Sequence, residues 1–194
     1  MKHISFIWAI VSASVLFTLG AFAQKDSSGI YKTVADFQQG KLSYAINYKT
    51  QTHKINDELL FNESEVKVKH EGVSYTLKKS ETYGYRDMKG IDYRFVDNQS
   101  YKILNKGEAL PLYVFKKAKA EKGATQYVSV YYFSKDIGSA PQLLTKDNLK
   151  AAFPDNHKFH DAIDAQFRND AELPAYDSFH KMYKVNHLLI MNPI

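Results

Sequence analysis

Histidine and aspartate residues gather most densely between residues 155 and 164, where the sequence reads DNHKFHDAID. On a helix, His157 and Asp161 form an i,i+4 pair, and His160 and Asp164 form another. An aspartate at that spacing can orient an imidazole, and both side chains can also bind one metal ion. These four residues are therefore candidates for a metal site or an acid–base site, and they suggest metal-assisted hydrolysis as one possible function.

The same pattern is also typical of the solvated face of an amphipathic helix. Phe159, Ile163 and Phe167 fall on one apolar stripe, and the His/Asp pairs fall largely on the opposite side. Such pairs stabilise an exposed helix face modestly, and the order of residues is not the H-E-x-x-H of a zinc peptidase. The sequence favours this structural role, with the hydrolase as the alternative.

Tyrosines form a second group that could act on a ligand, because an aromatic ring with a hydroxyl tip suits a pocket that is apolar and selective. The alternative is that tyrosine is simply a good strand former, half-buried with its hydroxyl in water. Neither a G-x-S-x-G elbow nor a glycine-rich phosphate loop occurs in the sequence. The candidates on predicted strands are Tyr83, Tyr85, Tyr93, Tyr101 and Tyr131.

Composition narrows the classes of function. The 194 residues contain no Cys, which excludes a disulfide framework, a thiolate metal site and a Cys nucleophile. The formal net charge is only +5, and the sequence shows no concentrated basic face of the kind that nucleic-acid binding requires. The sequence therefore predicts no nucleic-acid partner, and nothing in it calls for a cofactor.

The first 23 residues read as a secretory signal peptide. A short basic start at Lys2 precedes an apolar segment from residue 4 to residue 20, and Ala21-Phe-Ala23 supplies the small residues of a cleavage site. The apolar segment is shorter than the roughly 20 residues that a membrane-spanning helix needs. We therefore expect cleavage, export to the periplasm, the outer membrane or the medium, and no transmembrane segment in the remaining chain.

Residues 24–194 are expected to form a single α+β domain. Residues 24–28 are predicted to be a polar lead-in, and a short helix is predicted to begin at Thr33 and stop at Gly40. Segments in which apolar and polar residues alternate then recur about every ten residues from 42 to 144, with turn signals between the segments. This pattern predicts an antiparallel meander of about seven strands, forming a curved sheet or a partly closed barrel.

Two or three helices are expected to follow between residues 145 and 185. Thr145 is a predicted cap of the first helix, Asp155 or Asn156 caps the second, and Pro174 lies in the first turn of a third that ends near Lys184. The run from 187 to 191 is short and apolar and is predicted to be a final strand. Strands followed by helices are typical of the α+β class.

Several long motifs are shared with a known group of proteins. They include Gly29-Ile-Tyr-Lys-Thr33, Tyr83-Gly-Tyr-Arg-Asp87 and Asp92-Tyr-Arg-Phe95. The segments FPDNHKFHD, starting at Phe153, and FHKMYKVN, starting at Phe179, complete the set. With these motifs the chain resembles small exported proteins of the Bacteroidota. The resemblance implies an exported bacterial setting and carries over no functional residues.

The function expected from the sequence is that of an exported envelope protein that binds or has a structural role rather than catalyses. Its partner would be a small molecule or another component of the cell envelope. An enclosed apolar pocket faced by tyrosines would favour binding. Polar groups that converge on a cleft would favour the hydrolase alternative.

Overall fold

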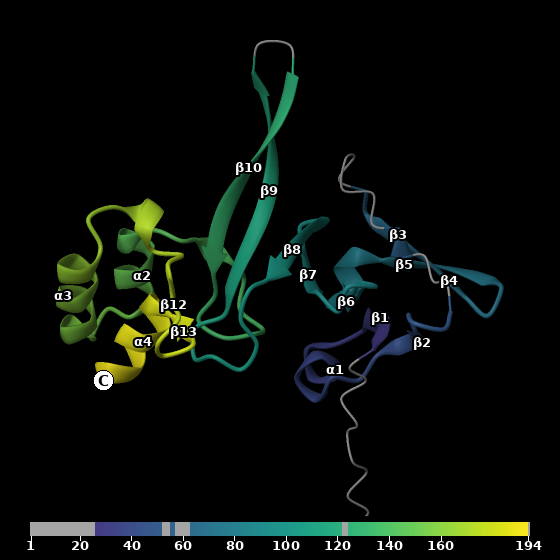
Figure 1. The fold of residues 1–194 in the computed structure, drawn as a ribbon, viewed down its shortest axis with the longest axis horizontal. Helices are drawn as coiled ribbons and strands as arrows, with labels where there is room; N and C mark the ends of the chain where they lie inside the picture. Colours follow the sequence, from purple (N-terminus) through teal and green to yellow (C-terminus); the bar gives the residue numbers. More distant parts are fainter. Residues whose placement is uncertain (1–25, 52–54, 57–62, 122–123, 194) are drawn as a thin grey trace, which may run out of the picture.

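The computed structural model describes residues 26–51, 55, 56, 63–121 and 124–193 of the chain. The predicted signal peptide, residues 1–23, lies outside these ranges. The described residues form an α+β fold around an open antiparallel sheet of eight strands (Figure 1). None of the helices in these ranges is both long and apolar enough to span a bilayer.

The main sheet has the strand order β11-β10-β9-β8-β7-β6-β1-β2. From β6 to β11 each strand pairs with its neighbour in sequence, which confirms the predicted meander. The two ends of the sheet, β11 and β2, do not pair with each other, so the sheet does not close into a barrel. The strands are β1 (Ser27–Tyr31), β2 (Ser43–Asn47), β6 (Gly84–Arg86), β7 (Asp92–Val96), β8 (Gln99–Ile103), β9 (Leu112–Glu121), β10 (Ala124–Phe133) and β11 (Gln142–Leu143).

Strand β1 corrects the prediction of a loose lead-in at residues 24–28. It lies between β6 and β2, and every residue from Ser27 to Tyr31 is buried. Ser27 and Ser28 made this segment look like a polar tail. Both serines pair with β2, and the rest of β1 pairs with β6, so the segment is interior despite its composition.

The helix predicted between Thr33 and Gly40 is confirmed as α1 (Val34–Gln39). Thr33 and Asp36 form a reciprocal capping box, with distances of 3.0 Å from Asp36 N to Thr33 Oγ1 and 3.1 Å from Thr33 N to Asp36 Oδ2. Gly40 ends the helix with φ = 69°, a conformation that costs glycine little. Phe37 packs with Tyr31 and Tyr83 beneath this helix.

The predicted hairpin around Glu71-Gly72 is present, but it belongs to a separate small sheet. That sheet has the order β3 (Ile55–Asn56), β4 (Glu65–His70), β5 (Val73–Lys78). Glu71 and Gly72 both have positive φ, as a tight two-residue hairpin turn requires. Val66 and Val68 on β4 pack against Ile30 and other side chains of the main sheet, so the small sheet forms a second layer over one end of the large one.

The C-terminal residues form a helical layer at the other end of the main sheet (Figure 1). The helices are α2 (Lys146–Ala152), α3 (His157–Gln166) and α4 (Lys184–Met191), with a short hairpin of β12 (Tyr176–Asp177) and β13 (Met182–Tyr183) before α4. Thr145 and Asn156 cap α2 and α3 as predicted. The core beneath the helices combines Leu112 and Phe133 of the sheet with Leu149, Phe159 and Ile163, among others.

Two predictions for residues 174–194 are wrong. The third helix, expected from Pro174 to Lys184, is replaced by the β12–β13 hairpin, because Asp177 accepts backbone hydrogen bonds that close a turn. The strand expected at residues 187–191 is part of helix α4. Asn186 of α4 is fully buried, and its amide exchanges two hydrogen bonds with the backbone of Leu110, which fixes the helix against the sheet.

Candidate binding site

One row of side chains crosses the middle of the main sheet. In an antiparallel sheet, residues directly opposite each other lie on the same face. The register pairs Tyr85 with Tyr93, Tyr93 with Lys102, Lys102 with Val114, and Val114 with Tyr131. We call the side of the sheet that carries this row the pocket face.

Both covering layers lie on the pocket face. The small sheet covers Tyr85 and Phe95 at one end, and the helices cover Leu112 and Phe133 at the other. The register confirms this, because Phe95 is opposite Ser100 and Leu112 is opposite Phe133. The part of the face between the two layers holds a pocket of about 370 Å³, a size within the usual range for small-molecule sites. Its lining residues are Tyr93, Ser100, Lys102, Val114, Phe115, Lys116 and Tyr127.

The pocket combines apolar walls with a few polar groups that lack partners. Ser100 is only 5% exposed, and its hydroxyl has no hydrogen-bond partner among the described residues. Lys102 is half-buried and Lys116 is exposed. Within the described part of the chain, no carboxylate lies within 4.0 Å of either ammonium group. A buried hydroxyl without a partner is costly, so a ligand that bonds to it recovers that free energy.

The described lining of this pocket is mainly apolar and cationic. It includes no His, Asp or Glu. What it offers is two cations, the hydroxyls of Ser100, Tyr93 and Tyr127, and aromatic and aliphatic walls. This set can hold a molecule with an anionic group and an apolar body.

The five tyrosine candidates divide between the two faces of the sheet. Tyr93 lines the pocket, and Tyr85 stacks on it with ring centroids 4.7 Å apart and planes at 7°. Tyr131 is on the pocket face but packs against the core beneath the helices. Tyr83 and Tyr101 are buried on the opposite side, Tyr83 against Phe37 and Tyr101 in contact with other rings. The structure thus brings Tyr85 and Tyr93 together at the pocket and separates the others from it.

The opposite side of the sheet, which we call the arginine face, carries Arg86, Asp92 and Arg94. Arg86 and Asp92 form a two-point ion pair with distances of 2.7 and 2.9 Å, and the Tyr31 hydroxyl donates to Asp92 at 2.9 Å. The hydrogen bond to Asp92 raises the pKa of the Arg86 guanidinium. Burial raises the pKa of the Tyr31 hydroxyl well above its usual range, and the nearby Asp92 charge adds to this shift. Arg86 and Asp92 therefore neutralise each other on this face.

Arg94 is the most deeply buried cation of the arginine face, with 6% of its surface exposed. Its guanidinium donates to the Tyr113 hydroxyl at 3.0 Å, to Ser139 O at 2.9 Å and to Gly138 O at 3.0 Å. It also lies over the rings of Tyr83 and Tyr113. Arg94 therefore ties the loop after β10 to the centre of the sheet.

The His/Asp candidates of helix α3 are dispersed on its surface. Asp164 pairs with Lys146 at 3.0 Å and with Lys150 at 2.6 Å, and these bonds lower the pKa of its carboxyl. His160 Nε2 lies 2.8 Å from Phe153 O, and the rings of His157 and His160 meet edge-on. Asp161 is exposed. The metal-assisted hydrolase based on these four residues stays a prediction.

A different set of residues brings metal-binding atoms close together. Among the described residues, the one group of three His or carboxylate side chains whose donor atoms all lie within 4.8 Å consists of Asp177, His180 and His187. Sequence reasoning missed it because a helix was predicted there, which would have placed His180 at the edge of an apolar stripe. The motif FHKMYKVN with His187 directly after it held the relevant signal: two histidines seven residues apart, next to Asp177.

Sequence reasoning also missed Ser100, Lys102 and Lys116, whereas Tyr127 belongs to the strand tyrosines that the sequence offers as possible lining of a ligand cleft. Ser100 and Lys102 flank Tyr101 on β8, and Lys116 stands beside Lys117 on β9, so all three look like ordinary solvated strand residues. The only available signal was that Lys102 and Lys116 would share a face with Tyr93 once the strand register was known. Register is a property of strand pairing, so the sequence did not reveal it.

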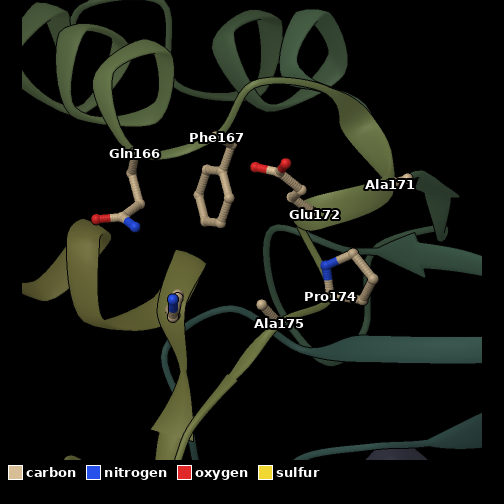
Figure 2. A pocket seen from close by; sticks show the side chains of 7 residues that line it. Gln166, Phe167, Ala171, Glu172, Pro174 and Ala175 are labelled. Carbon is tan, nitrogen blue, oxygen red and sulfur yellow. The ribbon is translucent and has the colours of Figure 1, made fainter.

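A second hollow, of about 300 Å³, lies between the end of α3, the turn that follows it and the start of α4 (Figure 2). Phe167 and Glu172 lie at its wall. The Glu172 carboxylate already accepts the backbone N–H of Arg168 at 2.9 Å. Gln166 and Lys184 are its other polar lining residues, and we assign no function to this hollow.

The fold and the pocket define a class: an α+β protein with an open antiparallel sheet, covered at both ends on one face and hollow between the covers. Comparison with family models, curated proteins and solved structures finds no match to this chain.

Proposed function

We propose that this chain is an exported, non-enzymatic binding protein whose pocket face takes a small amphiphilic anion. The observation that carries the proposal is the combination of Ser100, Lys102 and Lys116 around one apolar pocket. Two ammonium groups with no carboxylate of the described residues in contact, and one buried hydroxyl with no hydrogen bond among those residues, favour an anionic head group.

The body of the ligand would contact Val114, Tyr93 and Tyr127. Tyr127 is 54% exposed although it is a large aromatic residue, and a ligand in the pocket would cover part of that ring. Burying apolar area is worth about 25 cal/mol per Å². A carboxylate or sulfate on a chain of medium length meets both requirements, because its head can reach the lysines while its tail lies on the sheet.

Export is the second part of the proposal. The signal-peptide pattern of residues 1–23 and the resemblance to small exported proteins of the Bacteroidota support it. A binding protein in the cell envelope would meet fatty acids, detergent-like molecules and lipid fragments. These molecules belong to the chemical class that the pocket would take.

The test is calorimetric titration of the protein, expressed from the full chain, with octanoate, octanol and octylamine. We expect octanoate to bind tightest, because only its head group complements the lysines. The double variant Lys102→Gln/Lys116→Gln should weaken octanoate binding about tenfold, since two partly exposed ion pairs together contribute about 1.4 kcal/mol. Octanol binding should change little.

Lys117→Gln is the matched control. Lys117 follows Lys116 on β9, is exposed and points to the opposite face. The Lys117→Gln variant removes a charge of the same sign from the same strand as Lys116. Because Lys117 lies on the other face, the variant should leave octanoate binding unchanged. The proposal would be abandoned if octanoate bound no better than octanol, or if the control and the double variant weakened binding equally.

A further inference from the structure

The β12–β13 hairpin and helix α4 place two histidines and one aspartate at the surface of the helical layer. Asp177 is the last residue of β12, His180 lies in the turn, and His187 lies in the first half of α4. Their donor atoms all lie within 4.8 Å of one another. No two of the three are adjacent in sequence, so the hairpin and its packing on α4 create this proximity.

Backbone and side-chain hydrogen bonds hold the turn in place. Asp177 Oδ1 accepts the N–H groups of Phe179 at 2.9 Å and His180 at 3.1 Å, and Asp177 Oδ2 lies 2.8 Å from Nδ1 of His180. These bonds fix the Asp177 carboxyl group beside the His180 ring, with one of its oxygens within 4.8 Å of the nitrogen donors.

The two imidazole rings are in direct contact. The centroids of His180 and His187 are 3.9 Å apart, and the ring planes are inclined by 28°. Imidazole nitrogen is a common ligand of transition-metal ions, and this contact brings one nitrogen of each ring close to the other.

We propose that Asp177, His180 and His187 bind a divalent transition-metal ion. Two imidazole nitrogens and one carboxylate oxygen suit Zn²⁺, Ni²⁺ or Cu²⁺, whereas Ca²⁺ and Mg²⁺ prefer oxygen ligands throughout. Asp177 can serve as a direct ligand, or it can orient His180 through the bond to Nδ1 while Nε2 coordinates. In both arrangements the removal of Asp177 weakens the site.

The geometry needs only a small adjustment. Ligands of a tetrahedral zinc ion lie about 3.3 Å apart, given metal–nitrogen distances of 2.0–2.1 Å. The three donor atoms would therefore close by at most about 1.5 Å, a movement that the exposed His180 side chain can make. Three protein ligands leave at least one coordination position for water or another molecule. The site lies in the helical layer and is separate from the pocket of the main sheet.

The experiment measures metal binding by the protein expressed from the full chain without a histidine tag. Zn²⁺, Ni²⁺ and Cu²⁺ are titrated by calorimetry, with Mg²⁺ and Ca²⁺ as controls, and the melting temperature is followed in parallel. We expect one transition-metal ion per chain and a rise in melting temperature of about 5 °C at a hundredfold excess over Kd. Mg²⁺ and Ca²⁺ should have no comparable effect.

His180→Ala is the main variant, because His180 is exposed in a turn and its loss should not disturb the core. It should weaken binding at least tenfold, and Asp177→Asn should weaken it in the same direction. The matched control is His157→Ala/His160→Ala, which removes two histidines from helix α3 and should leave binding intact.

Electron paramagnetic resonance of the Cu²⁺ complex provides a readout that does not depend on the variants, and it should show two nitrogen ligands. The inference is overturned if no transition metal binds, or if binding persists in His180→Ala. It is also overturned if binding disappears in the His157/His160 control, which would assign the metal to helix α3.

Discussion

The two faces of the main sheet carry the same kinds of residue and use them in different ways. On the arginine face, Arg94 is buried with three hydrogen-bond acceptors and two tyrosine rings around it. On the pocket face, Lys102 and Lys116 surround an apolar hollow, with no carboxylate of the described residues in contact with either. Arg94 is part of the structure, and the two lysines are available to a ligand.

This difference shows that neither residue type nor burial by itself identifies a binding site. A buried polar group whose hydrogen bonds are complete stabilises the fold and has little left to offer a ligand. A group whose bonds are incomplete keeps its capacity to bind. The number of unpaired donors therefore separates the two faces better than the number of tyrosines or cations does.

The largest loss of stability should come from Arg94→Met. This substitution keeps an aliphatic stem but removes every hydrogen-bond donor of the guanidinium. Two backbone carbonyls then lose this partner and the Tyr113 hydroxyl keeps only Ser134, so we expect the free energy of unfolding to fall by about 3 kcal/mol. Urea denaturation monitored by tyrosine fluorescence measures this. Lys102→Met is the matched variant on the pocket face and should change stability by less than about 0.5 kcal/mol. Equal losses in the two variants would contradict the distinction between the faces.

A smaller effect is expected for Asp92→Asn on the arginine face. The substitution removes the charge that Arg86 pairs with, while the side chain keeps its shape. The Arg86 and Asp92 side chains are only 13% and 11% exposed, so the pair is poorly screened, and we expect a loss of about 2 kcal/mol. The same denaturation experiment measures it, with Asp97→Asn as control, because Asp97 is exposed. A loss below that of the control would show that the pair is not structural.

The next prediction is a loss of stability at high pH, caused by ionisation of buried tyrosines on the arginine face. Burial raises the pKa of Tyr101 to about 12 and raises that of Tyr83 well above its ordinary value of 10. A folded-state pKa above the unfolded one adds stability below pH 10, and this stability is lost as the pH rises through about 12. We therefore expect the protein to unfold in this interval. Ultraviolet titration should show a late tyrosine step that is smaller in Tyr101→Phe; a single step near pH 10 would contradict this.

The smallest effect should be that of Ser100→Ala. The Ser100 hydroxyl is buried without a partner among the described residues, so its removal should leave stability unchanged or raise it by a few tenths of a kcal/mol. The proposed function also predicts that the same substitution weakens octanoate binding. Ser134→Ala is the control on the arginine side, because Ser134 Oγ bonds to Tyr113 and to the backbone of Asp136, and it should cost about 1 kcal/mol. A marked loss of stability in Ser100→Ala would show that the hydroxyl has a structural partner.

Features that depend on neighbouring residues could be predicted from the sequence. The capping box of α1, the turn at Glu71-Gly72 and the caps at Thr145 and Asn156 all follow from local hydrogen bonding and permitted φ values. The alternation along the strands predicted the meander for the same reason. The α+β class is the sum of these local features.

The tertiary structure alone decided which elements lie together. It placed β1 inside the sheet despite two serines, moved the β4–β5 hairpin into a second layer, and replaced a helix by the turn that carries His180. It also determined that Tyr93 faces Lys102 while Arg94 faces the other way. These outcomes depend on pairing and packing between residues far apart in the chain, and local propensity does not encode which distant surfaces meet. The sequence by itself determined the elements and their turns, and long-range strand register decided where the pocket and the histidine cluster lie.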